Sequence, residues 1–540
     1  MNNLIWKQWQ ENKRVLVVCI GWMVLAAGYA IGYEMGHRLR APIGHLSGLA
    51  LFYNMFAAVF LAMRTALGEH ADGTHRFSAA LPIALPRLAA VRIWGAAATL
   101  VLPLLASALL LTVALGSGLV EQAAPRVFDS RINLLDRPTA SLATSLAQLW
   151  TVTAIATLGG LELLLILSVI GCRLRTQSQL GLLGAVMAFG SLLATGVFWS
   201  QHRNSLAQLI YGAVFPQSLV IHWSYGGATG RYNDHELVPR AWIALLAAVP
   251  VLLLIGGFFV RRYGTSRREK AAGTRGRFWA SLATLGSVIP FRPRTRGGAL
   301  IGSELRQSLP LATFGLLFAF LMALAEVLTE RQPGNYSFAT TLLMRMPHST
   351  WAVTTLWAVV VGSGLYSAEL NAGLGAFWRS RPISPRQWFW TKFVVGLLVV
   401  LTVSDGITIL ISWTSPRESM TTGMSWSYIL CMPIGHALTY TLAVWGTCWL
   451  RKPVLGGFVA ILGYMLMTAA MGAFGSSLEP IHVYNQLLTA ERAGRMEFTG
   501  HGYPVVYGAQ TLLVFLIAAF SYRLAKPLEP ARAWFNLRRA

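Results

Sequence analysis

Between two apolar runs the chain reads Glu69-His-Ala-Asp-Gly-Thr-His-Arg-Phe-Ser-Ala-Ala-Leu-Pro-Ile83. The pattern returns as Glu369-Leu-Asn-Ala-Gly-Leu-Gly-Ala-Phe-Trp-Arg-Ser-Arg-Pro-Ile383. Glu, Gly, Phe, Pro and Ile recur at one constant shift, 369 − 69 = 300, without a gap. Each copy follows one apolar run and precedes another. A polar segment repeated this closely indicates a duplicated membrane protein whose two halves present the same surface to a partner in water.

The composition is that of a polytopic membrane protein. Of 540 residues, 55% are hydrophobic and only 12% are charged, whereas soluble domains carry about 25% charged residues. The net charge of +23 comes from basic residues in short loops between apolar runs. That distribution sets membrane topology and favours anionic lipid headgroups, so we expect no nucleic-acid partner.

Apolar runs long enough to span a bilayer predict an all-α fold with about twelve transmembrane helices, six in each half. The predicted spans lie near residues 15–33, 46–67, 93–119, 144–171, 180–198, 241–260, 311–328, 351–368, 393–413, 428–450, 454–474 and 505–524. We expect a first six-span unit over 1–265, a basic cytoplasmic linker with an interfacial segment over 266–297, and a second six-span unit over 298–540.

The basic residues also predict the orientation. Placing both termini and the linker in the cytoplasm puts most of the 44 basic residues there. Each half then returns to its starting side, so the repeats are expected to be parallel. Before the first and seventh spans, Leu4 to Arg14 and Leu300 to Leu309 have apolar residues at helical spacing opposite polar ones. We expect each to form an amphipathic elbow helix in the membrane interface, from which the chain turns into the bilayer.

No catalytic motif is visible. No lysine follows a glycine, so the phosphate loop of ATPases is absent, and neither a zinc-helix motif nor a nucleophile elbow occurs. The chain is therefore expected not to be an enzyme and to hold no cofactor or metal. Three ionisable residues lie inside predicted spans, namely Glu162, Asp405 and His436. They either line a polar translocation path or are buried groups hydrogen-bonded to neighbouring backbone and hydroxyl groups.

The chain resembles the membrane subunit (permease) of an ABC transporter of the ABC-2 type. That family has an interfacial elbow helix, six spans per unit, and a segment E-x-x-x-G-T followed by L-P-I between the second and third spans. The residues that match the pattern are Glu69, Gly73, Thr74, Leu81, Pro82 and Ile83 in the first copy, and Glu369, Gly373, Pro382 and Ile383 in the second. The second copy departs from it at Leu374 and Arg381.

The resemblance implies that both segments are coupling helices, each docking on a separate ATP-binding cassette subunit, so one chain would recruit two. ATP and magnesium would then bind those ATPase partners. The family mostly exports amphipathic molecules such as drugs, lipids or peptides, and the expected location is the plasma (inner) membrane. A secondary active transporter of the twelve-helix parallel-repeat kind is the alternative. A membrane-embedded enzyme would need a cluster of carboxylates or histidines, and none is visible.

Overall fold

The computed structural model describes residues 2–71, 84–125, 137–174, 206–227, 230–263, 295–329, 337–366, 384–414, 426–450, 453–473 and 502–525, together with isolated positions between 180 and 191. The chain divides into two compact units, Met1–Gly273 (unit 1) and Thr274–Ala540 (unit 2). The boundary between them lies inside the predicted linker, whose residues 266–294 are outside the described ranges.

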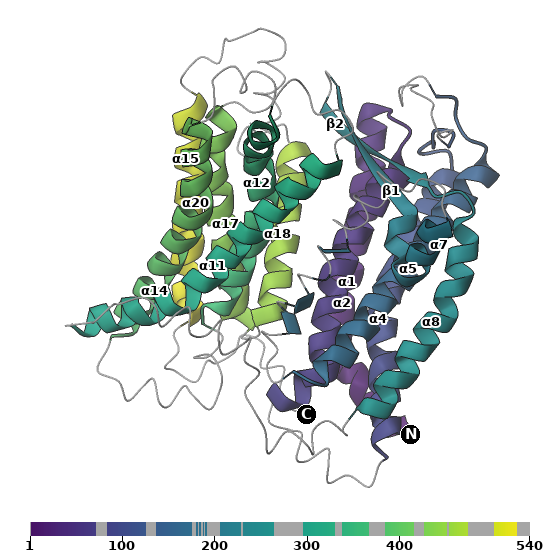
Figure 1. Ribbon diagram of the computed structural model, residues 1–540, viewed down its shortest axis with the longest axis horizontal. Helices are drawn as coiled ribbons and strands as arrows, with labels where there is room; N and C mark the ends of the chain where they lie inside the picture. The colour runs from purple at the N-terminus through teal and green to yellow at the C-terminus, as the bar shows by residue number, and fades with distance from the viewer. Residues whose placement is uncertain are drawn as a thin grey trace. The chain divides into compact units, whose positions relative to one another are not determined.

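Unit 1 is a bundle of long helices with one small hairpin (Figure 1). Its elements are α1 (Asn2–His37), α2 (Pro42–Ala71), α4 (Leu85–Gly116), α5 (Leu142–Gly171), α7 (Leu206–Val214), η2 (Pro216–Leu219), β1 (Val220–Gly227), β2 (Gly230–Leu237) and α8 (Ala241–Arg262). Within the bundle α1 packs on α4, α2 on α5, and α5 on α8. The antiparallel hairpin β1–β2 contacts α2 through its second strand.

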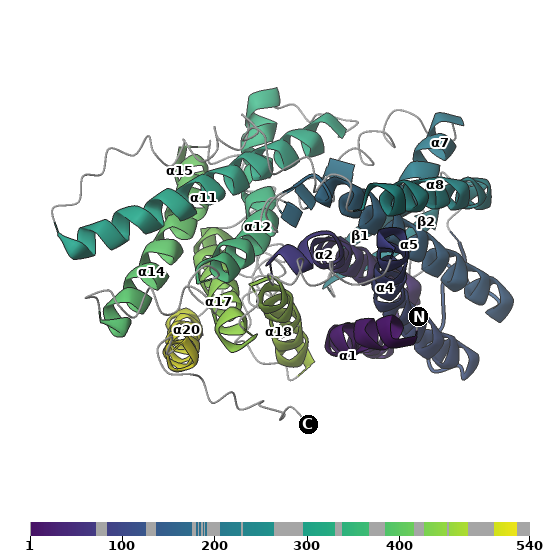
Figure 2. The same ribbon diagram turned by 90° about the horizontal axis from the view of Figure 1, so that it is seen from below.

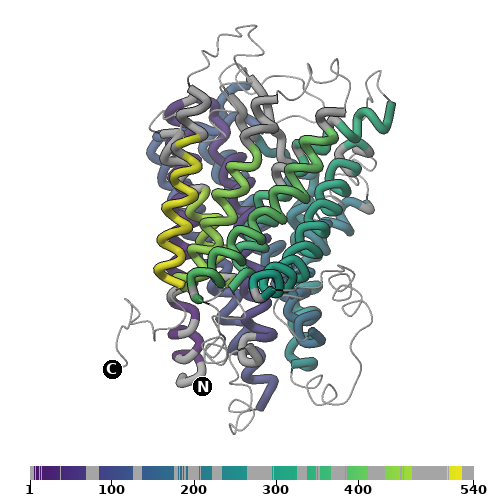
Figure 3. Tube along the Cα trace, turned by 90° about the vertical axis from the view of Figure 1, so that its left-hand side faces the viewer, coloured from purple at the N-terminus to yellow at the C-terminus, as the bar shows by residue number. Residues whose placement is uncertain are grey.

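Unit 2 is organised around α17. Its elements are α11 (Arg296–Thr329), α12 (Phe338–Gly364), α14 (Pro385–Val400), the π-helix η3 (Leu401–Gly406), α15 (Ile407–Thr414), α17 (Trp426–Leu450), α18 (Pro453–Ala473) and α20 (Gly502–Ala525). Figure 2 shows α17 between α18 and α20, and both helices pack against it. In Figure 3 the yellow helix α20 runs along the bundle beside the green helices of the same unit. The α11 helix packs on α12 and α14.

Seven helices of the described residues are long and apolar enough to cross a membrane. They cover Val15–Gly36, Pro42–Leu67, Leu85–Gly116, Leu142–Gly171, Ala241–Arg262, Gly297–Leu324 and Arg386–Ile411. Large apolar side chains on α8 are exposed, with Leu254 at 75%, as expected for a surface that faces lipid. The chain is therefore a helical polytopic membrane protein. The predicted fifth span lies mostly outside the described residues, and the other predicted spans overlap helices, seven of which are long and apolar enough to cross a membrane.

Local sequence fixes several helix starts. Ser141, Ser337 and Ser384 each accept a hydrogen bond from the backbone N–H three residues later, at 3.2 Å, and so cap α5, α12 and α14. Buried tyrosines then join neighbouring helices. Tyr53 on α2 donates to a backbone carbonyl of α4, and Tyr440 on α17 donates to Phe393 O of α14 at 3.0 Å. These hydroxyls satisfy their own hydrogen-bonding needs inside an apolar core.

The structure differs from the prediction in two respects. The prediction of separate elbow helices was wrong, because α1 and α11 each run unbroken from the amphipathic segment into the span. In α1 neither glycine nor proline separates the two parts, and in α11 Pro310 lies inside a helix that continues past it. The all-α prediction also missed the hairpin β1–β2, which pairs from Val220 with Leu237 to Gly227 with Gly230.

Candidate functional site

The two repeated segments lie almost wholly outside the described residues. Glu69 is in the last turn of α2, although its side chain is not described, and Gly73, Thr74, Leu81, Pro82 and Ile83 fall in the undescribed range 72–83. Glu369, Gly373, Pro382 and Ile383 fall in the undescribed range 367–383. The helices that follow are described, and they keep the spacing of the repeat. The α4 helix begins at Leu85 and α14 at Pro385, again 385 − 85 = 300 residues apart.

A buried lysine in unit 2 connects the described chain before the second segment to the helix after it. Lys392 lies at the start of the third turn of α14, and its ammonium donates to Leu365 O, just beyond the end of α12, at 2.9 Å. It also forms an ion pair with Glu304 of α11, with 3.5 Å between Nζ and Oε2. The two side chains are only 4% and 2% exposed. Lys392 therefore connects α11, the end of α12 and the start of α14.

Aromatic rings reinforce this lysine contact. The Lys392 ammonium lies 5.7 Å from the centre of the Tyr366 ring and 5.9 Å from that of Trp388, within range of cation–π attraction. Tyr366 also stacks on Phe389 at 5.1 Å and donates to its backbone carbonyl at 2.8 Å. The chain before and after the second segment is thus held together by two side chains, Lys392 and Tyr366.

Unit 1 has a buried cation at the equivalent position, since 392 − 92 = 300. Arg92 of α4 is 6% exposed, donates to the Tyr263 hydroxyl at 2.6 Å, and lies 5.8 Å from the centre of that ring. Tyr263 follows α8 directly, so Arg92 ties the start of α4 to the end of α8. Sequence reasoning missed both cations. A basic residue at the same repeat position, directly before two predicted spans, was the available signal.

Of the three ionisable residues predicted inside spans, the structure brings two together. Asp405 lies in the π-helix η3, and its Oδ1 is 2.7 Å from His436 Nδ1 on α17. Their side chains are 2% and 0% exposed. Within the described residues, Asp405 Oδ2 has no hydrogen-bond partner. The irregular turn therefore carries a buried acid–imidazole pair, and π-helical turns are frequent at functional sites.

Glu162 belongs to unit 1 and has a different environment. It lies on α5, is 1% exposed, and neither of its carboxyl oxygens has a hydrogen-bond partner among the described residues. Two side-chain amides approach α5 nearby. A Cβ added at Gly160 would lie 2.7 Å from Asn54 Oδ1, and one at Gly159 would lie 2.8 Å from Gln217. Asn54 itself donates to Ala156 O at 2.7 Å.

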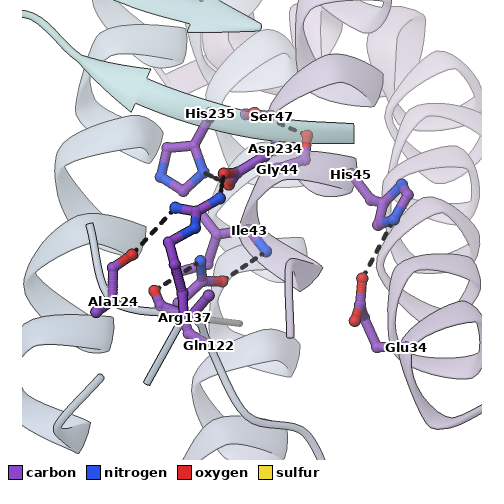
Figure 4. Close-up of polar contacts among 11 residues, drawn as sticks. Glu34, Ile43, Gly44, His45, Ser47, Gln122, Ala124, Arg137, Asp234 and His235 are labelled. Atoms are coloured by element: carbon purple, nitrogen blue, oxygen red, sulfur yellow. Dashed lines mark hydrogen bonds and ion pairs between the residues drawn. The ribbon is translucent and has the colours of Figure 1, made fainter. Parts of the chain in front are cut away.

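A second polar cluster of unit 1 lies around the turn between α1 and α2, on the side of the hairpin (Figure 4). The buried side chains of His45 and Glu34 are 3.2 Å apart between Nε2 and Oε1. Gln122, from the chain after α4, accepts a hydrogen bond from Ile43 N at 3.3 Å. The cluster therefore fixes where the helix pair α1–α2 meets the chain that follows α4.

The hairpin contributes charged groups to the same cluster. Arg137 forms an ion pair with Asp234 of β2 and donates to Ala124 O at 3.1 Å, as Figure 4 shows. His235 Nδ1 is 3.8 Å from Asp234 Oδ1. Burial lowers the pKa of His235, and Arg137 lowers it further, although Asp234 opposes the shift. The imidazole is thus held neutral by its surroundings.

These clusters consist of pairs rather than metal cages. Among the residues that the structure describes, no group of three or more His, Cys, Asp or Glu side chains could hold a metal ion. The buried polar groups can instead orient helices, exchange protons or bind a charged ligand. Comparison of the chain with protein-family models, with curated proteins and with solved structures finds no match.

Proposed function

We propose that the chain is the membrane-spanning subunit of an ATP-driven ABC transporter of the ABC-2 type, with both termini in the cytoplasm of the plasma (inner) membrane. In this proposal it exports an amphipathic small molecule, lipid or peptide and is energised by two separate ATP-binding subunits. The observation that carries the proposal is the repeated segment that starts at Glu69 and Glu369. Each copy lies between the second and third long helices of its unit.

The helix packing supports a duplicated architecture of twelve spans. Five helix–helix contacts within unit 1 have a counterpart within unit 2. In unit 1 they are α1–α4, α2–α5, α5–α8, α1–α2 and α2–α4, and their counterparts in unit 2, in the same order, are α11–α14, α12–α17, α17–α20, α11–α12 and α12–α14. Counterparts occur in the same chain order, as parallel repeats require. Arg92 and Lys392 occupy one repeat position and are both buried.

The contacts of Lys392 suggest how a segment could be coupled to the bundle. A partner that moves the Glu369 segment would pull on Leu365 and on α14, which Lys392 joins to Glu304 of α11. Movement at the membrane surface would therefore reach three helices of unit 2 together. This is the mechanical property that an ATP-driven permease needs, because its energy source lies outside the membrane.

The test is capture of the ATPase by the tagged chain from its native membrane, combined with ATP hydrolysis by the purified complex. We expect Glu69→Lys and Glu369→Lys each to reduce capture, whereas Glu121→Lys should not, because Glu121 is an exposed acid that follows α4 and belongs to neither segment. Leu81→Arg should impair capture strongly, since a charge would replace an apolar contact. Arg381→Leu should leave it unchanged or improve it. If all variants capture ATPase as wild type does, the segments are ordinary loops and the proposal fails.

The buried pair Asp405–His436 favours the alternative, a secondary active transporter. Titratable pairs inside membrane spans often carry protons in such proteins. The purified chain in liposomes separates the two functions. Uptake driven by a proton gradient without any ATPase would support the secondary transporter, and uptake that requires the ATPase partner and ATP would support the ABC permease.

A further inference from the structure

Glu162 is the most isolated acid that the structure describes inside a span. Its side chain is 1% exposed, and both carboxyl oxygens lack a hydrogen-bond partner within the described ranges. A carboxylate in such a place is costly unless a positive charge or a proton compensates it. Ordinary core packing does not require an acid here, because Leu or Met would fill the same volume at no electrostatic cost.

The helical register of α5 places this acid on a defined stripe. Gly159, Glu162, Ile166 and Val169 follow one another at spacings of three, four and three residues, so they lie on one face of the helix. The Gln217 side chain covers Gly159 at one end of the stripe. Ile166 lies about 6 Å from Glu162 along the helix axis at the usual rise per residue.

Ile166 and Val169 also line an apolar groove between α5 and α8. The other lining residues are Ile170, Leu254, Ile255 and Phe258, and the groove has a volume of about 320 Å³. Leu254 is 75% exposed and Phe258 44% exposed. The groove is therefore open on the apolar outer surface of unit 1, where a molecule dissolved in the bilayer can enter. Its volume is at the lower end of the range for small-molecule sites.

The stripe thus places an acid without a described partner about one helical turn from an open apolar groove. We propose that unit 1 binds a cationic amphipath at this place, with the cationic group directed to Glu162 and the apolar body in the groove between α5 and α8. Charge complementarity selects this occupant. A lipid acyl chain could fill the groove, but its binding would not depend on a carboxylate, and an anionic amphipath would gain nothing from one.

As a statement about substrate class, the proposal rests on the proposed export function, but binding itself can be measured without any ATPase. Tetraphenylphosphonium and tetraphenylborate are suitable probes, because they match in size and shape and differ in the sign of their charge. Binding of each to the full chain in lipid nanodiscs is measured by equilibrium dialysis, after subtraction of binding to protein-free nanodiscs. The variants are Glu162→Gln and Glu162→Asp, with Glu121→Gln as a matched control at an exposed acid.

We expect the phosphonium to bind the wild type and the Glu121→Gln control equally. Glu162→Gln should weaken phosphonium binding at least about tenfold, with no comparable change in borate binding. Glu162→Asp, which keeps the charge, should retain most of the binding. A second pair of variants tests the groove: Ile166→Trp should weaken phosphonium binding by narrowing it, whereas Leu253→Trp, on the exposed surface outside the groove lining, should not.

Phosphonium binding by folded Glu162→Gln equal to wild type would overturn the assignment, and so would a loss that is the same for phosphonium and borate. An equal loss in Glu162→Asp and Glu162→Gln would assign the effect to side-chain shape and refute the role of charge. Failure here is distinct from failure of the export proposal. If the chain captures an ATPase but its phosphonium binding does not depend on Glu162, only the proposed binding site is refuted. If phosphonium binding depends on Glu162 but the chain captures no ATPase, only the proposed ATP-driven function is refuted.

Discussion

Replacing Lys392 by methionine should strongly destabilise unit 2. Methionine keeps most of the apolar stem of lysine but removes the charge that faces Glu304 at 3.5 Å and the donor to Leu365 O at 2.9 Å. Because the two side chains are only 4% and 2% exposed, solvent screens this pair little. Removing one partner of a buried ion pair costs about 3–5 kcal/mol, mainly because the other charge stays buried without compensation.

A double-mutant cycle separates this effect from simple loss of packing. Glu304→Gln in the Lys392→Met background removes the uncompensated acid, so the double variant should be less destabilised than Lys392→Met alone, by about 1–3 kcal/mol. The matched control is Arg386→Met, which removes an exposed cation from the same helix and should change stability by less than about 0.5 kcal/mol.

The assay is unfolding in mixed micelles of mild detergent and dodecyl sulfate, followed by circular dichroism and checked for reversibility. The free energy of unfolding is compared among wild type, the two single variants, the double variant and the control. If Lys392→Met differs from Arg386→Met by less than about 1 kcal/mol, the pair is not the buried contact that the distances indicate. Equal stability of the single and double Lys392 variants would refute coupling between the lysine and Glu304.

The remaining predictions concern the membrane pair, the hairpin and the topology. Asp405→Leu should lower the free energy of unfolding by about 1–3 kcal/mol, because His436 loses its 2.7 Å partner; stability equal to wild type would contradict the pair. Burial lowers the pKa of His235, so the unfolded chain binds more protons, and stability should fall as the pH drops below the ordinary histidine value of about 6.5 and towards the folded pKa. His235→Gln should reduce this acid sensitivity in a pH series of melting curves, and an unchanged series would assign it to other groups. In a cysteine-free background, Glu121→Cys should react with an impermeant thiol reagent in intact cells and Arg386→Cys should not; the opposite result would invert the orientation.

The long helices could be predicted from sequence because their signal is one-dimensional. A run of apolar residues long enough to span a bilayer defines a helix without reference to the rest of the chain. The same reasoning failed at the start of α1, since an amphipathic pattern reads alike whether the chain turns after Arg14 or continues into Val15. The π-helix around Asp405 left no mark in the sequence, because one extra residue in a turn does not change an apolar run.

The candidate site was predictable only as a set of residue types. Glu162, Asp405 and His436 were identified because ionisable groups are rare in apolar runs. That Asp405 meets His436 depends on how η3 packs on α17, which spacing along the chain does not specify. The hairpin did carry a signal, since Gly226, Gly227 and Gly230 cluster at its turn.

The two halves of the repeat place a buried cation at the same position, but the two cations make different contacts. Arg92 and Lys392 hold the same place in the repeat and are both buried, but Arg92 donates to the neutral hydroxyl of Tyr263 from the end of α8, and Lys392 pairs with the acid Glu304 of α11. The planar guanidinium can bind a phenol and its ring together, whereas a compact ammonium is suited to a carboxylate and a carbonyl. Exchanging the two cations should therefore harm both units. A force applied at the first segment would reach α8, which also lines the proposed groove, and one applied at the second would reach α11. If partner subunits act on both segments, the two units respond through different helices, and only unit 1 links its segment to the proposed cation site.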